Sequence, residues 1–226
     1  MNNQFNILDF ACGTQDTGPL FPQIQEMSKG YDYDAENSVD ELAKFYDTLP
    51  SFEPNLDAFI LHKQAKPTDF LSNSLTSVGY LVSEKAKTLL SQFNLPEHKF
   101  YPASVLHKNE PLKGYYWLQI INDFRKFVDY GKSHFFIYQN FSKNAGSIKI
   151  QSEQDYLEKN SSIRINDPTL CIWANKISFT DKFPSHLDFF ALSKFNSNTF
   201  VSKKLSQSLM DHIITGLVIK STNIIA

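Results

Sequence analysis

The sequence is poor in the residue types that build covalent frameworks and membrane segments. Its two cysteines, Cys12 and Cys171, are too few to form a disulfide framework for a chain of 226 residues, and they lack the Cys-x-x-Cys spacing of metal and redox sites. Residues 1–9 have no basic start and no apolar core, so no signal peptide is expected. No stretch approaches the roughly 18 apolar residues of a membrane span. These absences predict a cytoplasmic protein with no membrane association.

Short catalytic motifs are also missing. The chain has neither Gly-x-Gly-x-x-Gly nor Gly-x4-Gly-Lys-Ser/Thr, so it lacks both standard phosphate-binding loops. It has no Gly-x-Ser-x-Gly elbow and no His-Glu-x-x-His pair. Arg125 and Arg164 are the only arginines in the sequence, and a guanidinium group is the side chain best suited to hydrogen-bond bases and phosphates. Nucleic acid is therefore not an expected partner. The sequence therefore favours a binding protein that needs no catalytic residue, cofactor or metal ion.

Two alternatives remain open at this point. A small cytoplasmic enzyme would need a carboxylate or Cys171 to converge with distant histidines. Cys171 lies in the apolar run Leu170–Trp173, where a buried and inert thiol is the usual outcome. An adaptor or self-associating module would use an exposed strand edge or an apolar patch. The histidines available to an enzyme are His62, His98, His107, His134, His186 and His212.

One strand–helix–strand pattern occurs twice in the chain. Residues 80–82 favour a strand, and Ser83 is suited to cap a following helix because its hydroxyl can accept from an unpaired amide. The pattern returns at residues 199–209, with Ser202 at the cap position. Apolar runs at 100–106 and 216–219 complete the two copies. The apolar stripes of the two predicted helices are Ala86, Leu89, Leu90 and Phe93 in the first copy and Leu205, Leu209 and Ile213 in the second.

The remaining elements are mostly strands. Residues 115–121 are aromatic and β-branched with little polarity, which predicts a central strand buried on both faces. Ser38 opens a capping-box pattern and predicts a helix through Leu49, and Ser152 can open a short helix. Asn144–Gly146 is a predicted turn. The sequence therefore predicts an α+β fold with a mixed, largely antiparallel sheet and a few amphipathic helices. Further strands are expected at residues 5–10, 59–61, 135–138, 170–173 and 187–192.

Charge is distributed unevenly along the chain. Residues 1–57 contain eleven acidic and two basic residues, a net charge of −9, whereas residues 58–226 carry +7. An acidic segment can face a charged partner, or it can be solvated or pack over a basic part of the same molecule. Lys66-Pro67 is the predicted boundary between an acidic N-terminal segment, residues 1–66, and a main α+β domain, residues 67–226, on which the segment is expected to pack.

Eight short motifs follow one another between Asp69 and Val218. They are Asp69-Phe70, Leu81–Lys85, Phe100–Pro102, Tyr115–Ile121, Asp129 with Ser133, Phe189-Phe190, Val201-Ser202 and Thr215–Val218. Their order resembles that of an α+β family of immunity proteins from bacterial polymorphic toxin systems, the eleventh in the usual numbering. The resemblance covers about two thirds of the chain and leaves residues 1–66 outside. The chain has Ala191 where the family often has an arginine.

The resemblance implies a non-catalytic toxin inhibitor. Such a protein would sit in the cytoplasm of the toxin-producing bacterium and would block a cognate toxin by occluding its active site or an essential surface. The chain itself is expected to be a monomer or a homodimer. An acidic surface would associate quickly with the basic cleft of a nuclease-type toxin. The residues predicted to contact this partner, with the tyrosines as anchors, are Tyr31, Asp32, Tyr33, Asp34 and Glu36.

Overall fold

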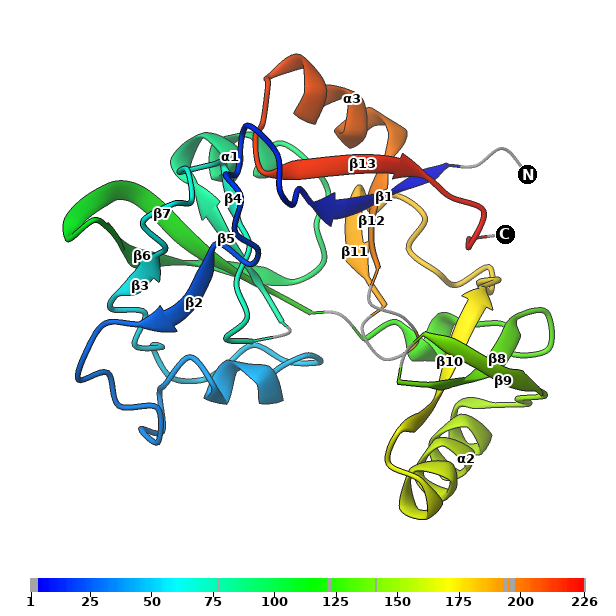
Figure 1. Ribbon diagram of the computed structural model, residues 1–226. Coiled ribbons are helices and arrows are strands. Elements are labelled where there is room, and N and C mark those ends of the chain that lie inside the picture. The colour runs from blue at the N-terminus through cyan, green and yellow to red at the C-terminus, as the bar shows by residue number, and fades with distance from the viewer. Residues whose placement is uncertain are drawn as a thin grey trace.

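The computed structural model describes residues 4–76, 78–121, 123–140, 142–192, 195 and 198–225. Within these ranges the chain forms thirteen strands, three α-helices and two 3₁₀ turns (Figure 1). The helices are α1 (Glu84–Leu90), α2 (Glu153–Asn166) and α3 (Lys203–Asp211), and the 3₁₀ turns are η1 (Glu41–Lys44) and η2 (Arg125–Phe127). The strands are β1 (Phe5–Phe10), β2 (Ile24–Met27), β3 (Phe59–Leu61), β4 (Phe70–Leu71), β5 (Tyr80–Ser83), β6 (His98–His107), β7 (Glu110–Ile120), β8 (His134–Gln139), β9 (Lys143–Ile148), β10 (Leu170–Lys176), β11 (Phe189–Ala191), β12 (Thr199–Ser202) and β13 (Leu217–Ser221).

The strands are divided among three sheets. Their orders are β2-β3-β6-β7-β5-β4, β11-β12-β1-β13 and β10-β8-β9. Among these described strands only β3 and β6 pair in parallel, and the other pairs are antiparallel. The predicted α+β class with mixed, largely antiparallel pairing is confirmed.

The predicted central strand is β7, which lies inside the six-stranded sheet between β6 and β5. Trp117, Leu118 and Ile120 of β7 are fully buried. The Trp117 ring stacks on Phe59 with 5.9 Å between ring centroids. Gly79 faces the same indole, since a Cβ atom on Gly79 would lie 2.5 Å from Trp117 Cε2. The indole therefore requires a residue without a side chain at position 79.

The repeated pattern forms two units with the same topology. In the first, β5 leads into α1, and β5 and β6 flank β7; in the second, β12 leads into α3, and β12 and β13 flank β1. The short strands β4 and β11 pair with β5 and β12 at equivalent places. The matching order β4-β5-β7-β6 and β11-β12-β1-β13 shows that one four-stranded arrangement with one helix is used twice. The middle strand β7 follows its unit in the chain, whereas β1 precedes its own.

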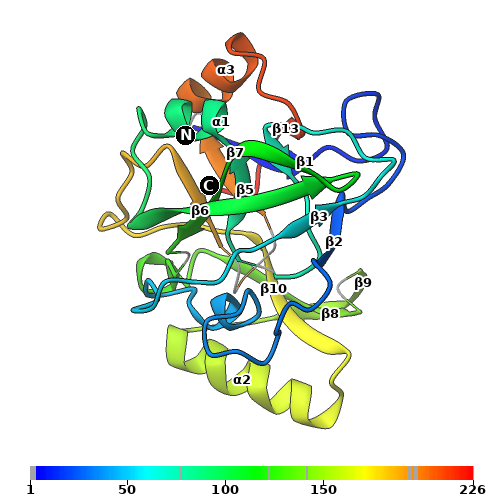
Figure 2. The same cartoon turned by 90° about the vertical axis from the view of Figure 1, so that its left-hand side faces the viewer.

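The sheets, helices and loops pack on one another through three apolar cores. One lies between the six-stranded sheet and residues 39–56, and a second is shared by the two repeated units and by α1 and α3. The third joins the outer face of the four-stranded sheet to a lobe made of β8, β9, α2 and β10. Both views place α1 and α3 together at one end of the molecule and α2 at the other (Figure 1 and Figure 2). No helix within the described residues is long and apolar enough to cross a membrane.

The N-terminal segment is paired into both larger sheets. β1 is bonded to β12 and β13, and β3 is bonded to β6. The division into residues 1–66 and 67–226 stays a prediction. These pairings show that the acidic segment supplies an interior strand to the four-stranded sheet.

Three local predictions were wrong. The helix expected after Ser38 is only the turn η1. The buried Ser38 hydroxyl has no hydrogen-bond partner among the described residues and so caps no helix, and the Phe45 carbonyl accepts from Gln119 instead of continuing a helix. The turn expected at Asn144–Gly146 lies within β9, which pairs with β8 through a shift in register. Both predicted helical stripes end early, since Phe93 lies beyond α1, and Ile213 lies beyond α3 and is exposed.

We predict that Gly79→Ala lowers the free energy of unfolding by about 3 kcal/mol, because it combines left-handed backbone strain with a clash against Trp117. The matched control is Gly30→Ala, since Gly30 also has a positive φ, +89° against +78°, but a Cβ atom there would enter open space. Urea unfolding of both variants would measure the difference. Equal losses would show that the indole tolerates a side chain at position 79.

Candidate functional site

Residues 28–58, which connect β2 to β3, form the most acidic part of the described structure, and we call them the acidic loop. They contain eight carboxylates and two lysines. Figure 1 shows them at the lower left, below the six-stranded sheet. They include all five residues predicted to contact a partner.

Two tyrosine hydroxyls hold the acidic loop in shape. The Tyr31 hydroxyl donates to the Asn55 carbonyl at 2.7 Å and accepts from the Val39 amide at 2.7 Å. The Tyr33 hydroxyl accepts from the Met27 amide at 2.9 Å, and the two rings meet edge to face. Burial raises the pKa of Tyr31, so its hydroxyl stays protonated and able to donate. Both tyrosines are therefore fixed before any partner arrives.

The acidic loop is also attached through its second half. Gln119 on β7 donates to the Phe45 carbonyl at 2.6 Å and accepts from the Trp117 indole at 2.9 Å. Phe45 packs edge to face on Phe52. Leu42 is fully buried against the six-stranded sheet. A loop of this length held at several points presents its exposed groups in a defined arrangement.

Most carboxylates of the acidic loop form no ion pair with a described residue. Among the described residues, Glu41 pairs with Lys44 at 2.6 Å and Glu53 pairs with Lys99 at 3.1 Å. Within the described part of the chain, Glu53 alone thus reaches a base outside the loop. Among the described residues, packing of the loop's acids over a basic part of the chain is therefore limited to Glu53, and the other exposed acids are solvated and give this surface a negative potential. The exposed carboxylates of the loop with no ion pair among the described residues are Asp32, Asp34, Glu36, Asp40, Asp47 and Asp57.

The five predicted residues differ in their roles. Asp32, Tyr33, Asp34 and Glu36 are exposed, whereas Tyr31 is half-buried. Asp32 also accepts from the Asp34 amide at 3.0 Å, which fixes a tight local turn. The geometry thus brings three carboxylates and one ring to the surface, with Tyr31 underneath.

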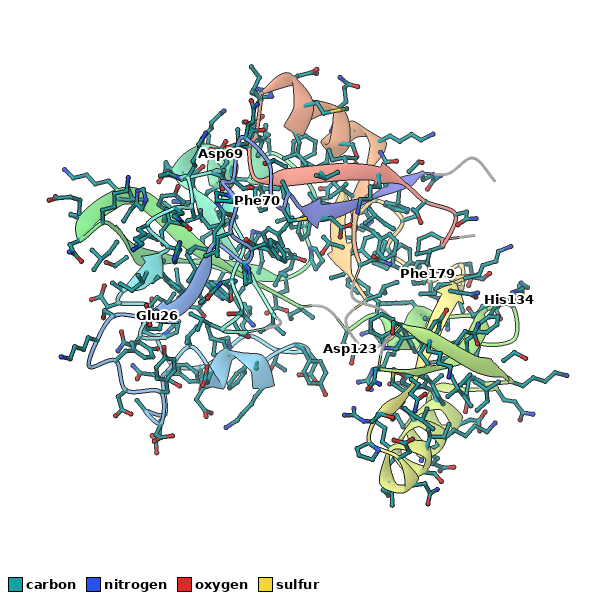
Figure 3. All side chains as sticks on the ribbon, in the orientation of Figure 1. Glu26, Asp69, Phe70, Asp123, His134 and Phe179 are labelled. Atoms are coloured by element: carbon teal, nitrogen blue, oxygen red, sulfur yellow. The ribbon has the colours of Figure 1, made fainter. Side chains whose placement is uncertain are left out.

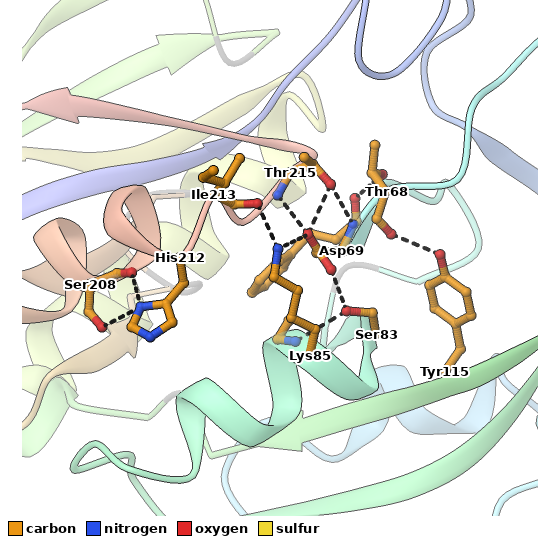
Figure 4. A network of polar contacts seen from close by, with 11 residues as sticks. Thr68, Asp69, Ser83, Lys85, Tyr115, Ser208, His212, Ile213 and Thr215 are labelled. Atoms are coloured by element: carbon orange, nitrogen blue, oxygen red, sulfur yellow. Dashed lines mark hydrogen bonds and ion pairs between the residues drawn. The ribbon is translucent and has the colours of Figure 1, made fainter.

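A second polar cluster, around Asp69, joins the two repeated units (Figure 4). Ser83 donates to Asp69 Oδ1 at 2.6 Å, and its hydroxyl accepts from the Ala86 amide to cap α1. Asp69 Oδ2 accepts from the amide of Thr215 at 2.9 Å and from its hydroxyl at 3.0 Å. Lys85 lies 3.7 Å from the same carboxylate. Asp69 therefore links the cap of α1 to the turn after α3.

Asp188 makes the equivalent contacts from the second repeated unit to the first. Ser202 donates to Asp188 Oδ1 at 2.7 Å and caps α3 by accepting from the Leu205 amide. Asp188 Oδ2 accepts from the amide of Asn94, just beyond α1, at 3.0 Å. Each aspartate thus binds the cap of its own helix and the turn beyond the other helix, and we call the pair the reciprocal clamp. The sequence signal for it is the shared 14-residue spacing from aspartate to serine.

The histidines supply no such cluster. No three His, Cys, Asp or Glu side chains within the described ranges lie close enough to hold a metal ion. His134 lies in the lobe, on the opposite side of the molecule from Glu26 and Asp69 (Figure 3). Cys171 is buried in β10, as expected for a core thiol, and Cys12 is exposed.

Comparison with known proteins gives one family. The sequence profile of a family described as "Immunity protein family (Imm11)" matches residues 23–222. The match begins well before Asp69, where the short motifs of the sequence begin, so it includes most of the segment 1–66. No curated protein matches the chain.

We predict that Asp188→Asn lowers the free energy of unfolding by about 2 kcal/mol, because two hydrogen bonds lose their charged acceptor. Asp181→Asn, an exposed change of the same chemistry, should cost less than about 0.5 kcal/mol. Thermal and urea unfolding would measure both variants. A loss at Asp188 as small as that at Asp181 would contradict a stabilising role for the clamp.

Proposed function

The chain belongs to the Imm11 immunity protein family, and we propose from this that it binds and neutralises a cognate bacterial toxin. The match over residues 23–222 is the observation that carries the proposal. The protein would act in the cytoplasm of the toxin-producing cell and would work by occlusion, with no catalytic step of its own. The partner is then a protein domain, encoded beside the immunity gene in a polymorphic toxin system.

We assign the toxin-binding surface to the acidic loop. Six of its exposed carboxylates form no ion pair with a described residue, which leaves them free to attract a basic partner and to speed association. A nuclease-type toxin, whose cleft must hold phosphates, has the complementary charge. The carboxylates at the centre of this proposal are Asp32, Asp34 and Glu36.

The attachment of the loop supports this assignment energetically. A binding segment that is already ordered loses less conformational entropy when the complex forms. The hydroxyl contacts of Tyr31 and Tyr33 provide that order. Tyr33 is 39% exposed, so its ring can also be buried by the toxin as an anchor. Tyr31 acts from beneath, as a positioning residue.

Co-expression tests the function directly. The protein should form a stoichiometric complex with the toxin encoded immediately upstream, stable at nanomolar concentration, and should restore growth of cells that express the toxin. A host poisoned equally with and without the protein, together with no complex, would contradict the proposal.

We predict that reversing Asp32, Asp34 and Glu36 to lysine slows association with the toxin by at least about tenfold at low salt. The matched control reverses the exposed acids Glu97, Glu158 and Asp181, which changes the net charge equally at other places on the surface. Stopped-flow or surface-based kinetics at two salt concentrations would measure both variants. Equal slowing by the two variants would assign the effect to overall charge rather than to the acidic loop.

A further inference from the structure

The turn that ends α3 places an isoleucine where glycine is usual. The Ile214 amide donates to the Leu209 carbonyl and the Ile213 amide donates to the Met210 carbonyl, both at 2.9 Å. This pair of bonds defines a Schellman motif, whose left-handed position is most often filled by glycine. Ile213 occupies that position with a φ of +51°. A β-branched residue is strained in this conformation, so isoleucine at position 213 is less favourable for the backbone than glycine would be.

The fold does not gain from the Ile213 side chain either. Ile213 is 73% exposed, and Met210, one turn earlier, is 54% exposed. A strained residue that presents an apolar side chain to water favours neither stability nor solubility. The arrangement is explained if the side chain is buried by a partner.

A hollow lies directly beside this protruding side chain. It has a volume of about 240 Å³ and lies between α1 and the turn that ends α3. Lys85 on its rim donates to the Ile213 carbonyl at 2.9 Å, which places the hollow and Ile213 next to each other. Its lining residues are Glu84, Lys85, Thr88, Leu89, Gln92, His212 and Ile214.

We propose that a second copy of the chain docks here, in a two-fold symmetric dimer in which Ile213 of each copy enters the hollow of the other. A two-fold interface needs one patch that is complementary to itself, and an apolar knob beside an apolar hollow has that property. The rim carries one acid, Glu84, and one base, Lys85, so like charges need not meet. The acidic loop lies at the other side of the six-stranded sheet and stays open in the dimer (Figure 1).

The dimer is tested by sedimentation equilibrium from about 1 to 300 µM protein, a range suited to a small interface. The wild type should pass from monomer to dimer within this range. Ile213→Gly should weaken dimerisation by at least about tenfold. It should also raise the unfolding midpoint, measured at monomer concentrations, by about 2–4 °C, because glycine accepts the positive φ. Ile165→Ala, at an apolar side chain that is 80% exposed on α2, should leave dimerisation unchanged.

A second variant tests the hollow without altering the α3 turn. Thr88→Trp should fill the hollow and prevent dimerisation, while Thr88→Ser should not. A wild type that stays monomeric at every concentration would overturn the proposal. Dimers of undiminished stability in Ile213→Gly and Thr88→Trp would do so as well. If Ile213→Gly instead weakened only the complex with the toxin, the toxin and not a second copy would be the occupant.

Discussion

The structure depends on two aspartates that hold two similar units against each other. Asp69 and Asp188 each accept from the serine that caps the helix of their own unit and from an amide beyond the helix of the other unit. Neither unit can therefore complete its own polar contacts alone. The shared core between them is built the same way, since Tyr80 of one unit bonds Thr199 of the other through their hydroxyls. The burial of Tyr80 raises its pKa to about 12, which keeps this contact neutral.

This joined pair of units provides a rigid support for surfaces that are less regular. The acidic loop rests on the outer face of the six-stranded sheet, and the lobe with α2 rests on the outer face of the four-stranded sheet. Because the loop is fixed at several points by β7 and by its own tyrosines, its exposed carboxylates form a defined pattern rather than a mobile tail. The clamp joins the two units, and β7 of the first unit holds the loop through the hydrogen bond from Gln119 to the Phe45 carbonyl.

The sequence predicted what depends on near neighbours in the chain. The caps at Ser83 and Ser202 follow from local chemistry, and the strand at β7 follows from its composition. The helix expected after Ser38 does not form because Gln119, far along the chain, takes the Phe45 carbonyl. In the same way, the contact between Asp188 and Asn94 and the two uses of one topology depend on pairings between distant segments. The acidic segment was evident from composition, but the burial of Tyr31 beneath it was not.

Hydrogen exchange of the backbone amides, with and without the cognate toxin, tests the account most directly. The account predicts that the toxin slows exchange across residues 28–58 and leaves α2 and the rest of the lobe unchanged. Slower exchange confined to the lobe or to α3, with the acidic loop exchanging as in the free protein, would contradict it.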